Sequence, residues 1–172
     1  MNYIWNKIAW GGDPDEINDV TGLSKRDIYN IRKSWTAMYA ESEKYGLQLF
    51  LGLFRLNPVT KTFFKTIQDL DEEAISNSAQ FRAHVINFMT SFNSAVTNLE
   101  HPEIVIALMN KLGESHRRRR IQKEHFDEVK VVLVDILKNQ LNASDDLLAS
   151  WTRFVGFIYK NIFEKLCETA DC

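Results

Sequence analysis

The sequence contains few residues that break helices. Only three prolines and seven glycines occur in 172 residues, and proline-free stretches run from 15 to 57, from 59 to 101 and from 103 to 172. Proline blocks helix interiors, whereas proteins built from short strands and turns need frequent proline and glycine. The scarcity of these residues argues against a β-rich chain and favours long helices.

The chain also lacks a marked excess of either charge. Lys and Arg total 21 against 23 Asp and Glu, for a net charge of -2, so we expect no bulk attraction to nucleic acid or to an anionic membrane. Runs of 18 apolar residues are absent, as is the apolar N-terminal stretch of a secretory signal. These absences predict a cytoplasmic protein with no membrane span.

Cysteine is scarce as well. Cys167 and Cys172 are the two cysteines of the chain, and a bridge between them would close only a tiny loop. Together with the expected cytoplasmic location, this favours reduced thiols.

The length fits one domain with a sizeable core. Residues 1–22 are rich in acidic side chains and show no sustained period, so we expect an N-terminal extension, a folded domain over 23–168 and a tail over 169–172. Trp5 and Trp10 in the extension either fold back on the domain or dock on a partner; folding back is the simpler interpretation.

From Leu23 onward, apolar residues recur at helical spacing. Ser24 and Asp27 have the spacing of a capping box, and Asn57 followed by Pro58 predicts the start of a short helix. A polar linker is expected over 69–77. Later stripes run through Phe81, Val85, Phe88, Met89, Phe92 and Val96, through Ile104, Leu108 and Leu112, through Phe126, Val129, Leu133, Ile136 and Leu137, and through Leu148, Trp151, Val155, Ile158 and Ile162. The pattern predicts an all-α protein.

Signatures of nucleotide-binding loops, nucleophile elbows, C-x-x-C pairs and zinc proteases are all absent from the sequence. Two histidines stand out instead, because His84 and His116 lie on different apolar stripes, 32 residues apart. A single histidine on such a face is usually a hydrogen-bonded core residue. Two of them among many phenylalanines in a helical frame point to haem, whose iron binds neutral imidazole and whose flat ring needs an apolar slot with basic groups at its rim.

At these positions the chain resembles the globin family, over about residues 23–166. Trp35, Gly46, Phe54 and Pro58 have the mutual spacing of the first three globin helices, and Phe64 follows Pro58 by six residues, as the haem-stacking phenylalanine does. FRAH, ending at His84, resembles an insect globin distal helix, and LGESHRRRR around His116 resembles the proximal segment.

The resemblance implies a globin fold of about eight helices in a three-over-three sandwich around haem b. It implies His116 as the permanent iron ligand and His84 above the iron, either as a hydrogen-bond donor or as a second ligand. Phe50 and Phe88 would crowd the gas pocket. The remaining haem contacts are expected from Phe64, Leu112, Ile121 and Arg120, the last through a propionate. His101 and His125 are expected at the surface.

The implied function is intracellular, reversible binding of O2, CO and NO, for oxygen binding, storage, transport or sensing. We expect bis-histidyl, hexacoordinate iron when gas is absent, and a monomer or weak homodimer. One alternative is a haem enzyme for NO dioxygenation or peroxide removal; this would need a separate reductase, because no flavin or nicotinamide motif is present. Another is a haem-free interaction module of the same shape.

Overall fold

The computed structural model describes residues 10–167. It contains the helices α2 (Lys25–Ala40), α3 (Ser42–Leu56), η1 (Pro58–Phe63), α4 (Glu72–Asn77), α5 (Ala79–Thr97), α6 (Pro102–Arg117), α7 (Lys123–Asn139) and α8 (Asp145–Leu166). Within this range the one strand-like feature is an isolated bridge between Ile17 and Ser24. The prediction of an all-α protein is confirmed.

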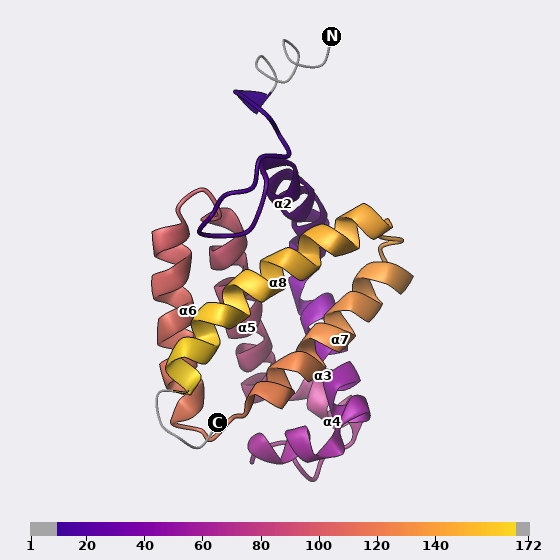
Figure 1. Cartoon of the computed structure of the whole chain (residues 1–172). Helices are drawn as coiled ribbons and strands as arrows, with labels where there is room; N and C mark the ends of the chain where they lie inside the picture. The colour runs from indigo at the N-terminus through magenta and orange to yellow at the C-terminus, as the bar shows by residue number, and fades with distance from the viewer. Residues whose placement is uncertain (1–9, 168–172) are drawn as a thin grey trace.

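The six long helices form two layers (Figure 1). In one layer α5 contacts both α2 and α6, and in the other α7 contacts both α3 and α8. The layers meet where α8 crosses α2 and α6 and where α3 crosses α5. The result is the predicted three-over-three sandwich, with α5 and α6 side by side.

Local sequence signals set several of the helix ends. The Ser24 side chain and the Asp27 side chain cap α2 reciprocally, Asn57 caps η1 through the Val59 amide, and Ser144 caps α8 through the Leu147 amide. These caps satisfy backbone donors that the first turn of a helix leaves without partners.

The prediction of a polar linker over 69–77 is wrong for residues 72–77. Residues Glu72–Asn77 form α4, with the Asp71 carboxylate accepting from the Ala74 amide at 2.8 Å. The helix is too short for a visible apolar period, since Ile75 is its single buried residue.

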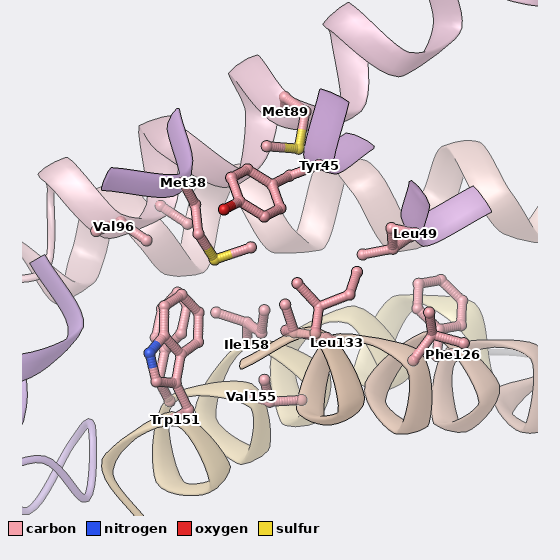
Figure 2. Packing of buried hydrophobic residues seen from close by; sticks show 14 of the residues in the cluster. Met38, Tyr45, Leu49, Met89, Val96, Phe126, Leu133, Trp151, Val155 and Ile158 are labelled. Carbon is pink, nitrogen blue, oxygen red and sulfur yellow. The ribbon is translucent and has the colours of Figure 1, made fainter. Parts of the chain in front are cut away.

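The core fills the space between the layers. Figure 2 shows side chains from α2 and α3 meeting side chains from α7 and α8; among them are Met38, Tyr45, Leu49, Leu133, Trp151 and Ile158. All of these residues are buried. In the described part of the chain, we find no helix with the length and apolar character that a membrane crossing requires.

A buried carboxylate connects the first and last long helices. Asp27 on α2 is 3% exposed, and Arg153 on α8 donates to its Oδ2 through Nε at 3.0 Å, while Ser150 donates to Oδ1 at 2.7 Å. Desolvation raises the pKa of Asp27, but hydrogen bonds from Arg153, the Ser24 amide and Ser150 outweigh it and lower the pKa to about 2. We call this group the α2–α8 clamp.

The described part of the extension packs on α2. The Trp10 ring meets Tyr29 edge to face at 5.6 Å, Lys25 donates to the Trp10 carbonyl at 2.8 Å, and the Arg26 amide donates to the Pro14 carbonyl at 3.0 Å. The prediction that Trp10 folds back on the domain is confirmed. Trp5 lies outside the described residues.

The expectation of reduced cysteines is wrong for Cys167, which is disulfide-bonded. Cys167 is the C-cap of α8, and its amide donates to the Phe163 carbonyl at 3.0 Å. A disulfide that closes a short loop removes little entropy from the unfolded chain and therefore stabilises the fold only weakly. Cys172 lies outside the described residues.

Candidate functional site

The structure brings His84 and His116 to one site between adjacent helices. His84 lies in the first half of α5 and His116 in the last turn of α6, and these helices contact each other. Each histidine also faces aromatic rings supplied by other helices. His116 is close enough to act electrostatically on His84, so the two apolar stripes identified from the sequence converge on one site.

On the α6 side, a hydrogen bond fixes His116. Its Nδ1 lies 2.9 Å from the carbonyl oxygen of Leu112, one turn earlier. A carbonyl can only accept, so Nδ1 carries the proton and Nε2 keeps its lone pair. This is the tautomer that a metal-ligating histidine needs.

A second contact supports His116 from α7. The Phe126 ring lies 5.2 Å from the His116 ring, and the Tyr159 hydroxyl on α8 donates to the Phe126 carbonyl. Phe126 is 9% exposed. Sequence reasoning placed Phe126 only in the core stripe of its helix, since the spacing within one helix does not show what a neighbouring helix presents to it.

On the α5 side, an aromatic cage surrounds His84. The ring lies 4.9 Å from Phe64 and 5.1 Å from Phe50, both edge to face, and stacks on Phe81 at 6.3 Å. Phe88, one turn further along α5, meets Phe50 at 5.2 Å. Phe50 is buried, and Phe64 and Phe88 are half-buried. The predicted distal residues thus come together, with Phe81 as an additional member.

Both imidazoles are held in the neutral form. Burial among the surrounding rings is the largest cause that lowers the pKa of His84 and of His116, although His84 keeps exposed surface. Neighbouring positive charge lowers both pKa values further: Arg119 acts on both rings, and a proton on His116 would disfavour protonation of His84. Neutral imidazole is the form that binds a metal.

Within the arginine run after His116, Arg119 lies close enough to lower the pKa of both histidines. Arg119 is exposed and donates to the Ser115 carbonyl oxygen at 2.7 Å. Arg120, the predicted propionate partner, is exposed in the turn after α6 with a φ of 57°, and it is not among the groups that shift either histidine pKa.

The other expected contacts lie around the same end of α6. Leu112 and Ile121 are half-buried and pack against the core. His125 lies near the start of α7, where its Nδ1 accepts from the Gln122 amide at 3.0 Å and its ring meets Phe63, so it acts in the helix start. His101 is exposed before Pro102.

The residues of the site fit a haem group. An oriented imidazole with a free Nε2, a second neutral imidazole, a wall of phenylalanines and an arginine nearby supply the ligands, the apolar slot and the cation that haem needs. Among the described residues there is no cluster of three or more His, Cys, Asp or Glu side chains that could hold a bare metal ion.

Known proteins are similar to this chain in sequence. Cytoglobin-2 of Danio rerio is 27% identical over 153 residues, covering 87% of this chain and 82% of that protein. The Globin-2 A chain of Anadara inaequivalvis is 30% identical over 131 residues, covering 75% of this chain and 86% of that one.

Solved structures agree with the fold. A Drosophila melanogaster globin superposes with a TM-score of 0.78 at 24% identity, covering 83% of this chain and 94% of that one. A hexacoordinated haem protein from an anhydrobiotic tardigrade superposes with a TM-score of 0.81 at 21% identity, covering 88% of this chain and 99% of that one.

The globin family model matches residues 47–162, which include both histidines and the aromatic cage. The match spans most of the folded domain and agrees with the layer arrangement. This chain belongs to the globin family.

Proposed function

We propose that this protein holds haem b between His116 and His84 and binds diatomic gases such as O2, CO and NO reversibly. Membership of the globin family supports haem-based gas binding. Haem supplies the gas-binding iron, and the protein supplies axial ligands and an apolar slot. A covalently attached haem is disfavoured, because the sequence has no C-x-x-C-H motif.

His116 is the permanent ligand in this proposal. The single observation that carries it is the hydrogen bond from Nδ1 to the Leu112 carbonyl, which directs Nε2 away from its own helix backbone. Phe64 and Ile121 would contact the macrocycle together with Leu112. Arg120 would meet a propionate, and Arg119 supplies a second positive charge near the histidines.

His84 is the second, displaceable ligand when gas is absent. Phe50 packs against His84 and Phe88 packs against Phe50, so the neighbours of His84 are apolar rings and its imidazole is the group able to fill a sixth coordination position. Two of the similar solved structures, from Drosophila melanogaster and a tardigrade, are described as hexacoordinate.

An absorption spectrum of the ferrous, gas-free protein tests the proposal. We expect a Soret band and a low-spin, six-coordinate pattern, followed by conversion to the CO form when CO is added. Protein without a Soret band after reconstitution with haem would contradict haem binding. A high-spin, five-coordinate spectrum would instead assign His84 as a hydrogen-bond donor to bound gas.

A further inference from the structure

Helices α6 and α8 approach each other so closely at Gly113 that no side chain fits between them. A Cβ atom on Gly113 would lie 2.3 Å from the carbonyl oxygen of Ile162 and 3.1 Å from Cβ of Lys165. Ordinary van der Waals contacts to a Cβ begin at 3.4 Å, so a methyl group here requires a displacement of about 1 Å.

This contact differs from the other tight glycine contacts of the molecule. A Cβ on Gly46 would meet Cγ1 of Val85 at 2.5 Å, and one on Gly52 would meet Cγ1 of Val132 at 2.7 Å. Those obstacles are side chains, which can turn or shift. At Gly113 the obstacle is the backbone of α8, so the whole of one helix must move.

Gly113 belongs to the face of α6 that is buried in the core. Met109 and Val105, one and two turns earlier, are also buried, and the C-terminal half of α8 crosses α6 (Figure 1). The separation of the two helices is therefore set by backbone contact at Gly113.

The same turn of α6 carries His116. His116 lies three positions after Gly113, which places the two residues about 60° apart around the helix axis. Because the His116 ring is tied to the Leu112 carbonyl, the ring moves with the helix backbone as one unit. A displacement of α6 at Gly113 is thus passed to the imidazole.

We propose that Gly113 is a positioning residue for His116: its missing side chain lets α6 seat on the α8 backbone and sets the depth at which the His116 imidazole enters the slot. The inference rests on the proposed function, since it concerns the bond from His116 to haem iron. A ligand must be held within about 0.5 Å of its productive position. The displacement of about 1 Å that a methyl group at position 113 requires is larger than this.

Gly113→Ala tests this inference, with Gly156→Ala as the matched control. Gly156 lies within α8, and no atom lies within 4 Å of an added Cβ. Both variants are made with His84→Leu, so that ferrous iron keeps one axial histidine and its iron–histidine stretching band is visible by resonance Raman spectroscopy. We expect Gly113→Ala to shift this band and to speed haem transfer to a scavenger protein by at least about tenfold. Gly156→Ala should change neither.

A second arm separates positioning of His116 from general damage to the slot. In a His116→Gly variant, imidazole from solution serves as the axial ligand and is not attached to α6. Adding Gly113→Ala to this variant should leave the imidazole-bound spectrum unchanged. If the spectrum changes there as much as with His116 present, the inference is overturned.

Equal stretching frequencies and haem-transfer rates for Gly113→Ala and its parent would also overturn it. Should alanine at 113 prevent folding, Met109→Phe adds bulk one turn earlier on the same face, and it must shift the band or the inference fails. Failure of the proposed function looks different, because the unmutated protein would then lack a Soret band.

Discussion

His116 and His84 are held by different kinds of contact. His116 is hydrogen-bonded to Leu112, backed by Phe126, and carried by a helix in backbone contact with α8. His84 makes only ring contacts with Phe50, Phe64 and Phe81 among the described residues, and it keeps exposed surface. Hydrogen bonds and backbone contacts fix a side chain, whereas aromatic edges let it move. The difference suits a permanent ligand on one side and a displaceable ligand on the other.

The largest effect on haem binding is expected from replacing His116. His116→Ala should purify largely without haem, or lose haem to a scavenger protein within minutes, because the remaining imidazole is held only by ring contacts. The Soret absorbance per protein measures this. His125→Ala is the control, because His125 acts in the start of α7 and should leave the spectrum unchanged. A His116→Ala protein that kept its haem and an unchanged iron–histidine band would contradict the comparison.

Replacing His84 should leave haem bound to His116 and leave the sixth coordination position of the iron accessible to gas. If His84 occupies the sixth coordination position, as proposed, CO must wait for it to leave, so the observed binding rate should level off at high CO concentration. His84→Leu should bind CO faster, with a rate linear in CO concentration, and give a high-spin ferrous spectrum. Stopped-flow mixing measures both proteins. Linear binding already in the unmutated protein would show that His84 is not an iron ligand.

The α2–α8 clamp bears on how firmly His116 is held, because it fixes α8, the helix against which α6 packs. The pKa of Asp27 falls from 3.8 to about 2 on folding, so its ionised form contributes about 2 kcal/mol above the ordinary carboxyl pKa. This contribution should disappear as the pH falls from about 5 to about 2.

Urea unfolding of the unmutated protein and of Asp27→Asn at several pH values tests the clamp. The difference in unfolding free energy between the two proteins should be largest near neutral pH and shrink toward pH 2, while contributions of other groups cancel. A difference independent of pH would show that the Asp27 charge does not stabilise the fold.

The smallest effect on the site is expected from deleting residues 1–22. The deletion removes the Trp10 contact with Tyr29 and the hydrogen bond from the Arg26 amide to the Pro14 carbonyl, but it leaves the Ser24 cap and the slot intact. We expect an unchanged haem spectrum and a loss of about 1–2 kcal/mol in unfolding free energy. Ser24→Ala in the full chain, which removes the cap alone, is the comparison, with a loss of about 1 kcal/mol. A shortened protein that no longer binds haem would show that the extension supports the site.

Much of the site was predictable because its signals lie within single helices. The placement of His84 and His116 on apolar stripes and the spacing from Pro58 to Phe64 are properties of consecutive residues. Resemblance to globins then supplied the pairing of the two helices, which periodicity alone leaves open. The structure places Phe50 and Phe64 beside His84, and Phe88 against Phe50.

By itself, the sequence determined the helical class, the caps at Ser24, Asn57 and Ser144, and the two histidine stripes, since each depends on interactions over three or four residues. Only the tertiary structure decided that Phe126 backs His116 and that the charge of Arg119 lowers the pKa of both histidines. The same holds for the seating of Gly113 on the backbone of Ile162. These relations join residues from different helices, or depend on where a helix ends, and both are set when the layers pack and not by local spacing.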